Sequence, residues 1–161
     1  MPRLSPLMVL ILSAALLAGC GGNKPESEPP ATPSTSSPGT TAVPAVSPYD
    51  AGPRAAESPV DGALAGKGEK LFQTKGCVAC HGFGKKITGP DLDGVTTRRT
   101  AQWMENQILH PEVMTKQDPI ARDLLRKYSV QMPNQKLTPE EARAVIEYLK
   151  KKNKEKSTAA N

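Results

Sequence analysis

The chain has 161 residues, with 21 basic and 16 acidic side chains and a formal net charge of +5. Aromatic residues make up only 4% of the chain and are not interleaved with the basic residues, which excludes a nucleic-acid binder that stacks on bases. Large apolar side chains are almost absent between residues 21 and 59, so we expect one small folded domain over the last hundred or so residues.

Residues 1–19 are predicted to be a signal peptide. Arg3 precedes an apolar run of 15 residues, 4–18, which is shorter than the roughly 20 residues of a membrane-spanning helix. The run ends in Leu-Ala-Gly-Cys20, which resembles the lipobox of bacterial lipoproteins and implies diacylglycerol on the Cys20 sulfur. The alternative is an ordinary small-residue cleavage site followed by an incidental cysteine.

Residues 20–60 are predicted to be a disordered linker rich in Pro, Ser and Thr. Nine prolines lie between residues 21 and 60, so the linker should be stiffer than a Gly/Ser coil. In a polyproline conformation it would reach about 120 Å at about 3.1 Å per residue. Tyr49 and Arg54 are too isolated to predict an ordered element. We expect the folded domain to span 61–152 and a flexible basic tail to follow at 153–161.

A first helix is predicted from the N-cap Asp61 to Lys75, with Gly76 ending it. Leu64, Gly68, Leu71 and Phe72 fall on one face of this helix. Glycine inside a helix costs about 1 kcal/mol relative to alanine, so Gly68 indicates a close crossing of two backbones.

The next five residues, Cys77-Val78-Ala79-Cys80-His81, form the C-x-x-C-H attachment signature of a c-type haem. Each cysteine sulfur can add to one porphyrin vinyl group, and the following imidazole can bind the iron. A thiol redox pair does not need His81. A zinc site needs more Cys or His than the domain offers, because His110 is its only other histidine and Cys20 lies far upstream.

A glycine-rich loop containing Gly89-Pro90-Asp91-Leu92 follows the signature. A second helix is predicted from the cap Thr100 to Leu109, stopped by Pro111. Its inner face carries either Trp103, Gln107 and Ile108 or Met104 and Ile108. Asp118 and Pro119 open a short third helix through about Arg126, with Ile120, Leu124 and Leu125 facing inward.

Met132, followed by Pro133 on a short loop, is the candidate sixth ligand of the iron. A thioether about fifty residues after the attachment site can approach the face opposite His81. The alternatives are a gap-filling core methionine at this position, Met104 or Met114 as the sulfur ligand, or a second imidazole from His110. A histidine before a proline at a helix end is more often a surface C-cap group.

The last helix is predicted from the capping box Thr138-Pro139-Glu140-Glu141. Ala142, Val145, Ile146 and Leu149 form its inner stripe, and a run of lysines follows toward the C-terminus.

Residues 61–150 resemble the class I cytochrome c family. The motifs that carry the resemblance are the C-x-x-C-H signature, Gly68 and Phe72 ahead of it, the Gly-Pro-x-Leu loop, the Met-Pro pair and Tyr148. The resemblance implies an all-α fold of about four short helices around one covalent haem, with the first and last helices crossing. It also implies that the Pro90 carbonyl binds the His81 ring, that Trp103 packs on the haem edge, and that Met132 is the distal ligand.

We therefore expect a membrane-tethered electron carrier of the bacterial cell envelope, not an enzyme, with its haem domain on the extracytoplasmic side. The excess of basic residues favours redox partners with an acidic face, such as a membrane oxidase or reductase. The alternative is a ligand-binding or sensing cytochrome in which the sixth position of the iron is open.

Overall fold

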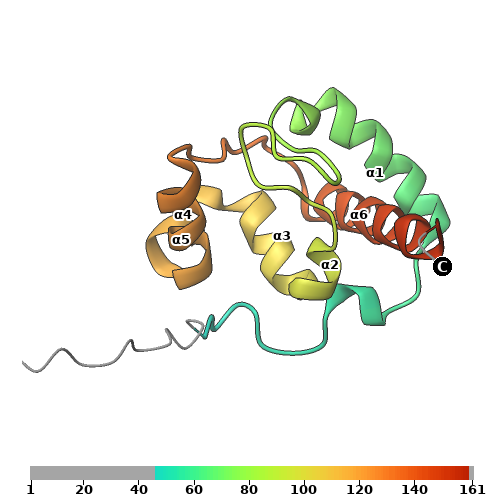
Figure 1. Ribbon diagram of the computed structural model, residues 1–161, viewed down its shortest axis with the longest axis horizontal. Coiled ribbons are helices and arrows are strands. Elements are labelled where there is room, and N and C mark those ends of the chain that lie inside the picture. Colours follow the sequence, from blue (N-terminus) through green and yellow to red (C-terminus); the bar gives the residue numbers. More distant parts are fainter. Residues whose placement is uncertain (1–45, 160–161) are drawn as a thin grey trace, which may run out of the picture. The chain divides into compact units, whose positions relative to one another are not determined.

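The computed structural model describes residues 46–159, and all regular elements within this range are helical (Figure 1). The predicted signal peptide, Cys20 and the predicted linker as far as residue 45 lie outside the described residues. The described elements, in chain order, are η1 (Ala55–Glu57), α1 (Gly62–Thr74), η2 (Cys77–Ala79), α2 (Val95–Arg98), α3 (Ala101–Leu109), α4 (Pro111–Gln117), α5 (Pro119–Tyr128) and α6 (Pro139–Ala159). The predicted all-α fold is confirmed.

Four helices begin where the sequence predicts an N-cap. The side chains of Asp61, Thr100 and Asp118 accept hydrogen bonds from the backbone N–H groups at the starts of α1, α3 and α5. At α6, Glu141 N donates to Thr138 Oγ1 at 3.2 Å, and Thr138 N donates to Glu141 Oε2 at 2.8 Å. These reciprocal bonds satisfy backbone donors that have no partner within the helix, so local sequence fixes the helix starts.

Helices α1 and α6 cross in extensive contact, as predicted (Figure 1). A Cβ atom built on Gly68 would lie 1.9 Å from the carbonyl oxygen of Ala144. The two backbones therefore touch where glycine removes a side chain, which confirms the predicted role of Gly68. Phe72 and Tyr148 pack beside the crossing with ring centroids 5.4 Å apart.

Helix α4 and the four-residue α2 were not predicted. Pro111 was expected only to stop the second helix, and α3 does end at Leu109. Pro111 is also the first residue of α4, with His110 as the shared cap between the two helices. Proline suits the first helical turn because the N–H that it lacks would be unpaired there in any case.

The predicted end of the linker at residue 60 is wrong. Ser47 is only 4% exposed, and Ala55 within η1 is 3% exposed. Ala55 N donates to the carbonyl oxygen of Arg99 at 3.0 Å. Residues 46–60 therefore pack on the helical domain through long-range contacts that composition does not reveal.

The flexible tail predicted at 153–161 is also wrong over its described part, because α6 continues to Ala159. Asn153 Oδ1 accepts from Gly94 N at 3.0 Å, and Lys156 forms an ion pair with Asp93. These contacts attach the extra turns of α6 to the loop before α2. Of the helices between residues 46 and 159, none is long and apolar enough to cross a membrane.

Candidate functional site

The turn after α1 places both attachment thiols at one cavity. Gly76 adopts the left-handed conformation with φ +76°, which favours glycine and turns the chain sharply after the helix. The following 3-10 turn brings Cys80 N to 3.2 Å and His81 N to 2.9 Å from the carbonyl oxygen of Cys77. Cys77, Cys80 and His81 consequently line the same wall of a largely apolar cavity.

The imidazole of His81 is oriented by the loop that follows it. Its Nδ1 lies 2.9 Å from the carbonyl oxygen of Pro90. A carbonyl oxygen only accepts, so Nδ1 is the donor in this contact, and in the neutral imidazole the lone pair then lies on Nε2. A Cβ on Gly89 would lie 2.8 Å from His81 Cε1, so the loop backbone packs directly against the imidazole ring. This arrangement suits a metal-binding histidine whose tautomer is fixed by a backbone acceptor.

Asp91 holds the same loop in shape. Its Oδ1 accepts from the backbone N–H of Asp93 at 2.9 Å and from that of Gly84 at 2.8 Å. The Asp93 N–H is the main cause, with Gly84 assisting, of a pKa for Asp91 below the ordinary aspartate value. The ionised carboxylate therefore stabilises the turn next to Pro90.

Met132 lines the same cavity from the segment between α5 and α6. Its side chain is partly buried, and Gln107 Nε2 on α3 lies 3.7 Å from the Met132 sulfur. Gln107 Oε1 is buried and has no hydrogen-bond partner among the described residues. The Gln107 amide is therefore a polar neighbour of the Met132 sulfur in the cavity.

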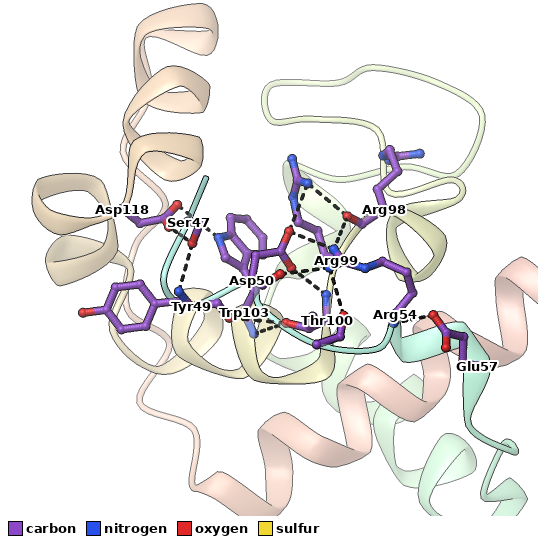
Figure 2. Close-up of polar contacts among 11 residues, drawn as sticks. Ser47, Tyr49, Asp50, Arg54, Glu57, Arg98, Arg99, Thr100, Trp103 and Asp118 are labelled. Atoms are coloured by element: carbon purple, nitrogen blue, oxygen red, sulfur yellow. Dashed lines mark hydrogen bonds and ion pairs between the residues drawn. The ribbon is translucent and has the colours of Figure 1, made fainter. Parts of the chain in front are cut away.

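Trp103 is 4% exposed and also lines the cavity. Its indole Nε1 donates to Asp118 Oδ1 at 3.1 Å, so the helix cap of α5 also fixes this ring (Figure 2). The Arg99 guanidinium lies over the ring at 5.2 Å from its centroid, within cation–π range.

All six residues predicted to bind or ligate the cofactor thus line one cavity: Cys77, Cys80, His81, Pro90, Trp103 and Met132. Of the competing ligands, Met104 also lines this cavity, whereas Met114 and His110 do not. Met114 is 1% exposed in the core, and His110 is an exposed cap between α3 and α4.

The thiol environment does not favour a redox-active cysteine pair. Burial is the main cause of a pKa for the Cys77 thiol above its ordinary value, and the neighbouring Cys80 adds to the rise. Reactive cysteines in such pairs have a lowered pKa, because the thiolate is the nucleophile. The pKa of Cys77 is raised instead, which disfavours its thiolate.

Two contributors to the cavity were missed by sequence reasoning. Gln107 was placed only on an inner helix face, although a single polar residue in an apolar stripe is itself a signal for a polar role. Arg99 gave no signal, because its position in the cavity wall depends on partners about fifty residues away.

The fold and this cavity agree with the family comparison. Residues 65–153 match the cytochrome c family, and the chain belongs to that family. Among solved structures, cytochrome c from Rhodothermus marinus is 36% identical with a TM-score of 0.58, over 63% of this chain and 96% of that one.

Two curated relatives match a shorter stretch of 35 residues. Cytochrome c-551 of Pseudomonas denitrificans is 49% identical over it, and cytochrome c-551 of Azotobacter vinelandii is 43% identical. Each match covers 22% of this chain and 43% of the relative, so the chain spans less than half the length of these two proteins in the match.

The protein is a mono-haem cytochrome c, with haem c attached covalently through Cys77 and Cys80. The residues present fit this group in three ways. Both thiols line the wall of an apolar cavity, the His81 Nε2 lone pair is free, and a thioether lines the same cavity.

Proposed function

We propose that the protein is a one-electron carrier in which His81 and Met132 would be the two protein ligands of the haem iron. The observation that supports this most directly is that His81, with Nδ1 bonded to the Pro90 carbonyl, lines one cavity with Met132 and both attachment thiols. Imidazole nitrogen and thioether sulfur are the ligand pair of electron-transferring c-type cytochromes.

The haem supplies reversible one-electron chemistry at the iron, and the protein determines what else can reach it. His81 contributes a nitrogen donor whose orientation the Pro90 carbonyl fixes. Met132 contributes a soft sulfur that favours the ferrous state, so the potential should exceed that of a bis-histidine site. With both positions filled, small ligands and substrates are kept from the metal.

We further propose that Lys86 and Tyr128 border the docking surface for redox partners. The Lys86 ammonium lies 5.0 Å from the centroid of the Tyr128 ring, and Tyr128 lines the cavity. Lys75 and Lys85 are close to Lys86 in the sequence and add positive charge to this region. A partner with an acidic face would be steered to this edge, since surface charge accelerates encounter more than it strengthens the complex.

Lipidation of Cys20 would place the domain at a bacterial membrane on the extracytoplasmic side. This rests on the lipobox resemblance and on the cysteine count, because one lipid and two thioethers use all three cysteines of the chain. Tethering would raise the effective concentration of the domain at membrane oxidases or reductases.

Carbon monoxide binding to the reduced protein tests the closed iron. We expect slow, weak binding at neutral pH, because Met132 must leave before carbon monoxide can bind. A Met132→Ala variant should bind it rapidly and serves as the positive control. Rapid, tight binding by the unaltered protein would instead establish a ligand-binding cytochrome with an open sixth position.

A further inference from the structure

Residues 46–58, named here the N-terminal strap, lie outside the stretch that matches the family and yet contact the haem cavity wall. The strap runs against the start of α3 and the cap of α5 (Figure 2). It was expected to be linker, and a linker does not need buried polar side chains. Its two most buried polar groups, Ser47 and Asp50, each bond a residue that fixes a cavity side chain.

Asp50 joins the strap to Arg99. The Asp50 side chain is 8% exposed, and its Oδ2 accepts from Arg54 Nη1 at 2.9 Å and from Arg99 Nη1 at 3.3 Å. Its Oδ1 accepts from Thr100 N at 2.7 Å, at the start of α3. One carboxylate thus holds two guanidinium groups, and the Arg99 guanidinium lies over Trp103 in the cavity wall.

Ser47 joins the strap to Trp103 through Asp118. Ser47 Oγ donates to Asp118 Oδ2, and Asp118 is completely buried. The other carboxylate oxygen of Asp118 accepts from the Trp103 indole at 3.1 Å and from Ala121 N at 2.8 Å. Without Ser47, the buried Asp118 carboxylate would lose one of the three hydrogen bonds that it accepts.

The strap is fixed at its other end by α6. Lys150 Nζ donates to Ser58 Oγ at 2.8 Å and to the Pro59 carbonyl oxygen at 2.7 Å, and the Lys150 side chain is only 3% exposed. The ionised lysine also pairs with Glu147 at 2.7 Å. Attachment at both ends holds the carboxylate of Asp50 at a defined place beside the cavity.

We propose that the N-terminal strap is a functional part of the redox site, in which Asp50 and Ser47 are positioning residues for Arg99 and Trp103 that set the reduction potential. This inference rests on the proposed electron-carrier function. Positive charge near the iron favours the reduced state, and a partly buried charge is screened less than an exposed one. The Asp50 carboxylate pairs with Arg54 within the strap and with Arg99 in the cavity wall, so its negative charge lowers the potential.

Redox titration of the full-length holoprotein tests the inference with two variants that lose the same charge. Asp50→Asn is expected to shift the ratio of reduced to oxidised protein at a fixed ambient potential at least about threefold toward the reduced form, or about 28 mV. Glu57→Gln removes an exposed strap carboxylate whose described hydrogen bond is to Arg54 N, away from the cavity, and should leave the ratio unchanged. Asp50→Glu should restore most of the unaltered value.

Arg99→Gln is an independent test of the inference, and it also serves if Asp50→Asn fails to mature. This variant is expected to shift the ratio of reduced to oxidised protein toward the oxidised form. Ser47→Ala should change the fluorescence of Trp103, the single tryptophan of the chain. Equal potentials for Asp50→Asn and Glu57→Gln would overturn the inference while leaving the electron carrier intact. If Asp50→Asn does not mature, an unchanged potential in Arg99→Gln overturns it. Loss of reversible redox behaviour in the unaltered protein would overturn the proposed function instead.

Discussion

The Nδ1 atom of His81 lies 2.9 Å from the carbonyl oxygen of Pro90, nine residues further along the chain. This contact links the attachment signature to the loop that closes over it. Because the acceptor is a backbone atom, no side-chain substitution removes it directly. The adjacent Gly89 provides the means to disturb it, since its backbone lies against the imidazole ring.

Replacement of Gly89 by alanine should raise the reduction potential. The added Cβ would lie 2.8 Å from His81 Cε1, so the ring or the loop must move and the bond to Pro90 lengthens. An imidazole with a weaker acceptor on Nδ1 is a poorer donor, which disfavours the ferric state. A redox titration measures the change, and Gly66→Ala, where a Cβ meets nothing within 4 Å, is the matched control. Identical potentials in the two variants would contradict this role for the loop.

Replacement of Gly68 by alanine should destabilise the fold by about 3 kcal/mol or more, at the upper end of overpacking effects. The new methyl group would collide with the Ala144 backbone at 1.9 Å, and neither helix can yield without breaking the crossing. Gly66→Ala on the same helix should instead stabilise by up to about 1 kcal/mol, because alanine favours helix. Denaturant unfolding of the two holoproteins distinguishes these outcomes, and equal midpoints would show that the crossing is not the constraint on Gly68.

The caps and apolar stripes of the helices were predictable because they depend on residues a few positions apart. Asp61, Thr100, Asp118 and Thr138 each bond a backbone N–H three positions further along. The role of Gly68 at the crossing was also predictable. Glycine destabilises a helix interior relative to alanine, so its presence there indicates a close backbone contact.

The strap and the last turns of α6 were not predictable, because partners distant in the sequence determine them. Helix α4 was missed for a local reason: Pro111 was interpreted only as a helix stop, although proline also suits a first helical position. Ser47 bonds a residue 71 positions away, and Asn153 bonds one 59 positions away. The composition of the strap is similar to that of residues 21–45, so only the structure reveals its contacts with the domain, among them those of Ser47, Asp50 and Ala55. The six predicted site residues line one cavity, because one motif fixes the positions of three of them and the order of the remaining motifs matches the family pattern.

The loop beside His81 should lose a stabilising interaction in acid. The pKa of Asp91 lies below its ordinary value, so its carboxylate contributes stability that is present above the ordinary value of about 3.9 and lost as pH falls through the lowered one. Asp91→Asn should therefore be less stable than the unaltered protein at neutral pH, with the difference shrinking below about pH 4. Thermal unfolding across this range measures it. A difference that grows in acid would give the opposite sign and contradict the assignment.

The apo domain should be weakly structured. Side chains of α1, α3 and α6 line the cavity, and its apolar walls would be solvated without the porphyrin. We expect a Cys77→Ser/Cys80→Ser variant to lose much of its helical circular dichroism signal and its cooperative thermal transition. A variant with the helix content of the holoprotein would show that the chain folds without its cofactor.

The ferric absorption spectrum is the most direct test of the proposed axial pair, because the sulfur-to-iron band reports a methionine ligand. The band should be present in the unaltered holoprotein and in Met104→Leu and Met114→Leu, and absent in Met132→Ala, with the covalent haem retained in all four. Its absence from the unaltered protein, or its survival in Met132→Ala, would contradict ligation by Met132 and with it the closed iron of the electron carrier.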